Sequence, residues 1–157
     1  MQKSPDSRAL RVIFVAFLGL GFLLDRALKY LAMRGLPQEE LFIIPNVLSF
    51  TLYENRGMAF GIAVPFLPLI AAGAALLVIL LALIIYSVKM DRPIWLYASC
   101  AIFIGGLSNF IDRALYDATI DYLYLRPFSF INIADIMIVG GCLVSLAAFR
   151  KDKTSNA

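Results

Sequence analysis

The sequence predicts an all-α membrane protein with four transmembrane helices and a small extracytoplasmic β-sheet. Of its 157 residues, 61% are hydrophobic and the mean hydropathy is +0.83, whereas soluble domains are about half apolar. Four apolar runs each reach the roughly 20 residues that a helix needs to cross the hydrocarbon core. We expect spans near residues 11–33, 65–88, 94–115 and 131–149, within a single integral membrane domain covering residues 1–157.

The first apolar run is expected to stay in the protein rather than to be removed as a signal peptide. Basic residues precede it, as they do in secretory signals. However, the run is long, contains Asp25 and Lys29, and lacks a small-residue cleavage site. We therefore interpret it as a retained helix.

The distribution of basic residues predicts how the chain crosses the membrane. One side has Arg34, Arg56, Arg113 and Arg126. The other side has eight basic residues: Lys3, Arg8, Arg11, Lys89, Arg92, Arg150, Lys151 and Lys153. Because cytoplasmic segments carry the excess of Lys and Arg, we expect a multi-pass protein with both termini in the cytoplasm.

The segment of about residues 41–64, between the first two spans, is expected to form the extracytoplasmic β-sheet. Apolar and polar side chains alternate from Leu48 to Tyr53, which is typical of a strand with one buried face. The alternation ends at a turn around Asn55 and Gly57. We expect this sheet to lie on the outer membrane surface, with its apolar face toward lipid or substrate.

Composition argues against metal and nucleic-acid binding. The chain has no His, and Cys100 and Cys142 are isolated within the third and fourth spans. The usual ligands of zinc are therefore missing, and we interpret both cysteines as small residues in helix packing. The basic residues form no stripe interleaved with aromatic residues, so nucleic acid is not an expected partner.

Polar residues are predicted to gather at the outer ends of the spans. A charge at mid-bilayer costs about 2.5–3.5 kcal/mol on insertion scales, so each charged residue in a span is expected to have a structural or functional role. Lys29 follows Asp25 by four residues, a spacing that favours an ion pair on one helix face. Seven residues are expected to meet at one depth: Asp25, Asn109, Asp112, Arg113, Asp121, Asn132 and Asp135. The alternative interpretation is interfacial snorkelling and helix capping.

Two carboxylates in one poorly hydrated site share a proton, so that one acts as a base toward water while the other donates to a carbonyl oxygen. We expect Asp121, on the outer loop between the last two spans, and Asp135, on the facing helix, to form this pair. Without His, a Ser-His or Cys-His nucleophile is excluded. A Ser-Lys pair would require Ser108 or Ser129 to meet Lys29, which Asp25 keeps charged.

Several stretches of the sequence resemble the signature of the lipoprotein signal peptidase family, also called signal peptidase II. They are residues 105–113 (GGLSNFIDR), 120–122 (IDY), 132–135 (NIAD) and 55–60 (NRGMAF), together with Asp25 and Lys29 in the first span. The resemblance covers nearly the whole chain, with the motifs in the family's order. The interval from Asp121 to Asp135 is shorter than the family usually has, which bears on the shape of the external loop.

This resemblance implies an aspartic endopeptidase of the bacterial cytoplasmic (inner) membrane. Such an enzyme removes the signal peptide from diacylglyceryl-modified prolipoproteins, at the amino side of the lipidated cysteine. The resemblance assigns catalysis to Asp121 and Asp135, with Asp112 as a structural residue paired with an Arg. It gives supporting or substrate-binding roles to Asp25, Lys29, Asn55, Gly57, Asn109, Asp112, Arg113 and Asn132.

The same resemblance implies no metal or organic cofactor. The expected partners are lipid-modified prolipoproteins and membrane lipid, and the expected state is a monomer. Two alternatives stay open. The first is a small transporter or channel that uses the outer-leaflet acids as a proton or cation path. The second is a catalytically inactive member of the family.

Overall fold

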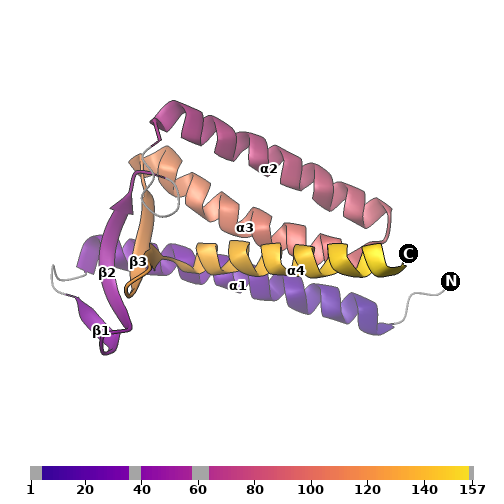
Figure 1. Ribbon diagram of the computed structural model, residues 1–157, viewed down its shortest axis with the longest axis horizontal. Helices are drawn as coiled ribbons and strands as arrows, with labels where there is room; N and C mark the ends of the chain where they lie inside the picture. Colours follow the sequence, from indigo (N-terminus) through magenta and orange to yellow (C-terminus); the bar gives the residue numbers. More distant parts are fainter. Residues whose placement is uncertain (1–4, 36–39, 58–63, 156–157) are drawn as a thin grey trace.

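Helices side by side, with a small sheet across one end of them, make up the molecule (Figure 1). The computed structural model describes residues 5–35, 40–57 and 64–155. The beginning of α1 and the end of α4 lie together at the end of the bundle opposite the sheet. The described chain runs along the bundle four times, once in each helix, so it begins and ends at the same end of the bundle.

Four helices are found in the described part of the chain: α1 (Pro5–Gly35), α2 (Phe66–Lys89), α3 (Pro93–Tyr116) and α4 (Ile133–Ser155). Three stretches of them are long and apolar enough to cross a membrane: Phe66–Lys89, Pro93–Tyr116 and Ile133–Arg150. Helix α1 has the length, but Asp25, Arg26 and Lys29 interrupt its apolar run. The mostly helical fold is thus confirmed, while the count of four spans stays a prediction.

The sheet has four antiparallel strands in the order β1-β2-β3-β4. They are β1 (Leu41–Ile44), β2 (Leu48–Asn55), β3 (Thr119–Leu125) and β4 (Ser129–Ile131). The first two come from the segment predicted to be β, whereas the other two come from the connection between α3 and α4. The placement of Asp121 on a loop was therefore wrong, because this residue lies on β3 and pairs with Tyr53 of β2.

Strand β3 was not identified from the sequence, because its burial does not follow the polarity of its side chains. Its first four residues, Thr119–Tyr122, are all buried. The strand pairs with β2 on one side and β4 on the other, and it also packs against α1 and α3. Thr119 and Asp121 are polar, yet they are buried together with Ile120 and Tyr122, because the strand is covered on both faces. Ile131 likewise ends β4 instead of beginning the fourth helix, which starts at Ile133.

Helices α3 and α4 approach closely through glycines. A Cβ atom on Gly105 would lie 2.4 Å from the carbonyl oxygen of Ala134, and one on Gly141 would lie 2.8 Å from that of Ala98. Small residues let helix backbones approach in this way. The contact fixes the relative position of Asn109, one turn beyond Gly105 on α3, and of Asp135, which follows Ala134 on α4.

Candidate active site

The beginning of α4 fixes the position of Asp135. Asn132 precedes the helix, and its Oδ1 atom accepts a hydrogen bond from the backbone N–H of Asp135 at 2.9 Å. In return, Oδ2 of Asp135 accepts from the backbone N–H of Asn132 at 3.2 Å. This is the reciprocal arrangement of a capping box. The carboxylate is therefore held at a helix N-terminus, where the helix dipole stabilises negative charge.

The same asparagine connects Asp135 to Asp121. Nδ2 of Asn132 donates to Oδ1 of Asp121 at 2.7 Å, so one side chain contacts both members of the predicted pair. Asp121 is 1% exposed. Asp135, whose side chain is half-buried, lines the same cavity as Asp121. The structure thus brings together the strand residue and the helix residue that the sequence analysis paired.

Three asparagines donate to these two carboxylates. Asn132 does so as described, Asn55 donates from Nδ2 to Oδ2 of Asp121 at 3.3 Å, and Asn109 donates from Nδ2 to Oδ1 of Asp135 at 2.8 Å. In each case the amide oxygen accepts from another group. These donors are the backbone N–H of Asp135 to Asn132, the backbone N–H of Gly57 to Asn55 at 3.1 Å, and Nζ of Lys29 to Asn109 at 2.9 Å.

The cavity beside the two carboxylates has a volume of about 410 Å³ and is mainly apolar. Leu69 and Leu76 of α2, Phe110 of α3 and Val139 of α4 line it, as does Phe130 of β4. Among the residues that the structure describes, no group of three or more Cys, Asp or Glu side chains is placed to hold a metal ion. The arrangement provides a pair of acids at the end of an apolar cavity.

The environment of Asp121 favours its protonated form. Burial, and then the neighbouring charge of Asp135, raise the pKa of Asp121 from 3.8 to about 7. The hydrogen bonds from Asn55 and Asn132 act in the opposite direction, because they stabilise the carboxylate. Near neutral pH the carboxyl of Asp121 can therefore hold a proton beside the carboxyl of Asp135.

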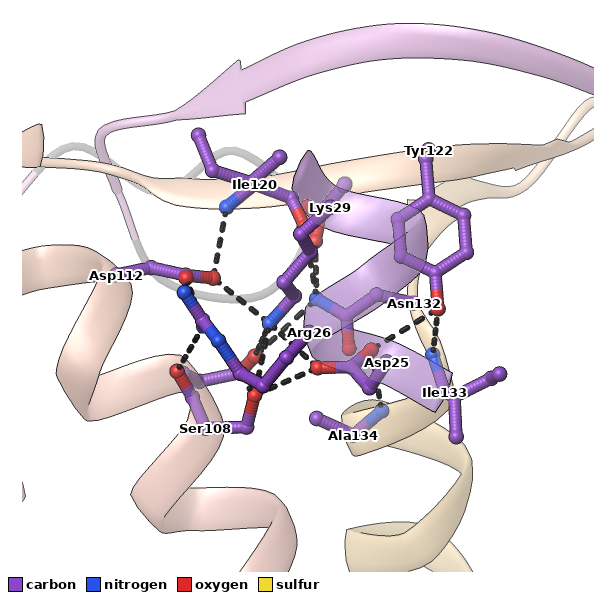
Figure 2. Close-up of polar contacts among 12 residues, drawn as sticks. Asp25, Arg26, Lys29, Ser108, Asp112, Ile120, Tyr122, Asn132, Ile133 and Ala134 are labelled. Atoms are coloured by element: carbon purple, nitrogen blue, oxygen red, sulfur yellow. Dashed lines mark hydrogen bonds and ion pairs between the residues drawn. The ribbon is translucent and has the colours of Figure 1, made fainter. Parts of the chain in front are cut away.

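A buried ion cluster, formed by Asp25, Arg26, Lys29 and Asp112, lies next to Asn109 and Asn132 (Figure 2). Lys29 is fully buried, and its Nζ atom lies 2.9 Å from Oδ2 of Asp25 and 2.7 Å from Oδ2 of Asp112. Arg26 also pairs with Asp112. The ion pair expected between Asp25 and Lys29 is present, and Asp112 is paired with an Arg as expected.

Three further residues complete this cluster and were not among the predicted site residues, although Ser108 was considered as the serine of a Ser-Lys pair. Besides Arg26, they are Ser108, whose Oγ donates to Oδ2 of Asp25 at 2.6 Å, and Tyr122, whose hydroxyl donates to Oδ1 of Asp25 at 2.9 Å. Spacing gave a signal for two of them. Arg26 precedes Lys29 by three residues, and Ser108 precedes Asp112 by four, so each pair shares a helix face. Tyr122 follows Asp121 on a strand, and nothing in its spacing pointed to Asp25.

Arg113 and Gly57 lie outside the ion cluster. Arg113 lines the cavity, and its Nη2 atom lies 3.5 Å from the carbonyl oxygen of Gly57, a long hydrogen bond. Gly57 in turn holds the side chain of Asn55. The remainder of that motif, Met58–Phe60, lies outside the described residues. The paired acids Asp121 and Asp135 are called the dyad below. Every site residue that the sequence analysis named belongs to the dyad, lines the cavity, lies in the adjoining ion cluster or contacts one of these residues.

Comparison with known proteins identifies the family of this chain. The family model for signal peptidase (SPase) II matches residues 17–150, which is most of the chain. The chain belongs to the signal peptidase II family. The predicted family is confirmed, and with it a protease that removes signal peptides.

The matches to individual relatives in the family cover most of this chain and most of each relative. The lipoprotein signal peptidase of Clostridium novyi is 34% identical over 149 residues, covering 89% of this chain and 96% of the relative. That of Streptococcus pneumoniae is 31% identical over 146 residues, covering 90% and 92%. That of Clostridium tetani is 30% identical over 140 residues, covering 85% and 89%.

Two solved structures of bacterial membrane enzymes share the fold. One, determined by the in meso method at 2.3 Å resolution, has a TM-score of 0.83 with 23% identity and covers 92% of both chains. The other, at 1.9 Å resolution, has a TM-score of 0.74 with 25% identity and covers 89% of this chain and 94% of its own. The helices and the sheet of this signal peptidase II family member therefore form an arrangement found in membrane enzymes.

Proposed function

We propose that this protein is an aspartic endopeptidase that removes the signal peptide from diacylglyceryl-modified prolipoproteins, at the amino side of the lipidated cysteine. Family membership supports the class of reaction. The observation that carries the catalytic assignment is that Asn132 contacts both Asp121 and Asp135 at the end of an apolar cavity. In this account Asp121 and Asp135 are the catalytic residues, and Asn55, Asn109 and Asn132 orient them.

The contacts of the two acids give them different roles. Asp135 receives two N–H donors at a helix N-terminus, which favours its ionised form. It takes a proton from a water molecule, whose oxygen then attacks the scissile carbonyl carbon. Asp121 gives its proton to the carbonyl oxygen. When the tetrahedral intermediate collapses, the C–N bond breaks, the proton held by Asp135 passes to the leaving amine, and the hydroxyl proton returns to Asp121 as the carbonyl re-forms.

The cavity fits a substrate that arrives from within the bilayer. Its lining by apolar residues of α2, α3 and α4 suits acyl chains or an apolar peptide segment. The acids lie at the end of the helices that carries the sheet. Such a position lets apolar substrate groups stay in a hydrophobic environment while a polar bond reaches the carboxylates.

The alternative of a transporter is not proposed. A path for ions needs polar groups along the length of a bundle. In the described part of the chain, the buried acids gather beside the sheet, and the most apolar membrane-length helix, α2, has no acidic residue. The alternative of an inactive family member is decided by the activity measurement below.

We further propose that α1 also crosses the bacterial inner membrane, that both termini are cytoplasmic and that the sheet lies outside the cytoplasm. The eight basic residues on one side and four on the other support this orientation. Alkaline phosphatase, which is active only outside the cytoplasm, should be active when fused after Gln38 or Asp117. It should be inactive when fused after Met90 or Lys153. An active fusion after Met90 would contradict the orientation and the outer-leaflet site.

The activity itself is tested with purified protein and a diacylglyceryl-modified prolipoprotein in detergent or vesicles. We expect one cleavage, immediately before the lipidated cysteine, measured by mass spectrometry of both products. The same prolipoprotein without its diacylglyceryl group is the control and should be cleaved far more slowly. Equal cleavage of both substrates would contradict the proposed specificity, and no cleavage of either would favour an inactive family member.

A further inference from the structure

Lys29 contacts the candidate active site through a single side-chain amide. Its Nζ atom has three N–H groups to donate, and three acceptors lie within 2.9 Å of it: Asp25 Oδ2, Asp112 Oδ2 and Asn109 Oδ1. A fourth oxygen, Oγ of Ser108, is farther away at 3.4 Å. Figure 2 shows Lys29 of α1 directed between Asp112 and Asp25. Two N–H groups are thus fixed by carboxylates, and the third is directed at Asn109.

The orientation of the Asn109 amide matters for the dyad. An amide side chain has an acceptor and a donor of nearly the same shape, so its surroundings decide which end faces which neighbour. With Oδ1 toward Lys29, Nδ2 donates to Asp135 at 2.8 Å. In the reversed orientation, two donors would face each other at Lys29 and two acceptors would face each other at Asp135. A lysine ammonium has no acceptor, so its presence excludes the reversed form.

The other two asparagines have no such dependence on a side chain. The oxygens of Asn132 and Asn55 accept from the backbone N–H groups of Asp135 and Gly57. Nδ2 of Asn132 also lies 3.2 Å from Oδ1 of Asn109. However, that group has two hydrogens and two other acceptors nearby, Asp121 Oδ1 and the Ile120 carbonyl. Lys29 is therefore the stronger determinant of the Asn109 orientation.

We propose that Lys29 is a positioning residue, which fixes the Asn109 amide so that its N–H group faces Asp135. The proposal rests on the proposed catalytic role of Asp135. In this proposal the buried ion cluster supports the active site, because Asp25 and Asp112 hold the lysine that orients Asn109. Lys29 fixes the amide of Asn109. Its charge also lowers the pKa of Asp121 from a distance.

A double-mutant cycle tests this role. Lys29→Met and Asn109→Leu should each lower kcat about 100-fold, the effect of losing one well-placed donor, with KM changed by less than about threefold. The double variant should be no slower than Asn109→Leu, because the two residues act as one unit. Losses that multiply to about 10⁴-fold would overturn the proposal.

Arg26→Met is the matched control. Arg26 also pairs with Asp112 and contacts Ser108, so its removal disturbs the ion cluster without removing the donor to Asn109. Its loss of kcat should multiply with that of Asn109→Leu. If Lys29→Met does not fold, the cycle is repeated with Asp25→Asn in every arm, which restores the charge balance. Wild-type cleavage is measured first: its absence contradicts the proposed function, whereas multiplied losses beside an active wild type contradict only the role of Lys29.

Discussion

Asp121→Asn and Asp135→Asn are each expected to lower kcat by about 10⁴-fold or more. Asparagine has nearly the shape of aspartate but can neither ionise nor hold the shared proton. Each variant should still insert into the membrane and keep its thermal transition, because the fold depends on the helix contacts and the ion cluster. The measurement is single-turnover cleavage of a lipidated prolipoprotein at matched protein concentration.

Asp117→Asn is the control for this pair. Asp117 ends α3 in the left-handed conformation, with φ of 57°, and is exposed. Asparagine tolerates that conformation well, so the variant should cleave at nearly the wild-type rate. The Asp121→Asn/Asp135→Asn double variant should be no slower than either single variant, since both acids serve one step. Substantial activity in either single variant would remove that residue from the chemistry.

Gly105→Ala is expected to lower both stability and activity. The new Cβ atom would lie 2.4 Å from the Ala134 carbonyl oxygen and 2.9 Å from the Ile138 side chain, so α3 and α4 must separate. Overpacking of this kind costs about 1–3 kcal/mol. Because Asn109 and Asp135 lie on opposite sides of this contact, separation lengthens their 2.8 Å hydrogen bond. We expect kcat to fall about 10- to 100-fold, since small misplacements at a reacting centre cost on that order.

Gly140→Ala provides the comparison. A Cβ atom at Gly140 would have no neighbour within 4 Å, so this variant should match the wild type in its thermal transition and its rate. Alanine is also the better helix former. Equal behaviour of Gly105→Ala and Gly140→Ala would show that the close contact between α3 and α4 does not position the site.

The helices were predictable from the sequence because apolar length alone identifies a span. The packing of the helices against one another was partly predictable, since a polar residue inside an apolar run needs a polar partner. The spacing of Asp25 and Lys29 predicted one such pair. What could not be predicted was the second half of the sheet. The buried residues of strand β3, Thr119–Tyr122, include polar ones, so their polarity does not separate an exposed face from a buried face. Asp121 was therefore assigned to a loop.

The residues of the candidate site were more predictable than the hydrogen bonds among them. Motif resemblance named Asn55, Asn109 and Asn132, but no spacing rule gives the direction of an amide. Which group donates to which depends on neighbours from α1, β2 and α4 that meet only in the folded chain. Tyr122 shows the same limit, because its hydroxyl reaches Asp25 of α1, 97 residues away in sequence.

Asp121 and Asp135 are proposed to share one proton and to activate water, and the pH dependence of kcat/KM tests this mechanism. Activity requires Asp121 to be protonated, and its pKa is raised to about 7. Activity should therefore be lost as pH rises through about 7, falling about tenfold per unit above that. A second loss at acidic pH should follow protonation of Asp135, giving a bell-shaped profile. A rate that instead rises from pH 7 to pH 9 would contradict the dyad and indicate a base such as lysine.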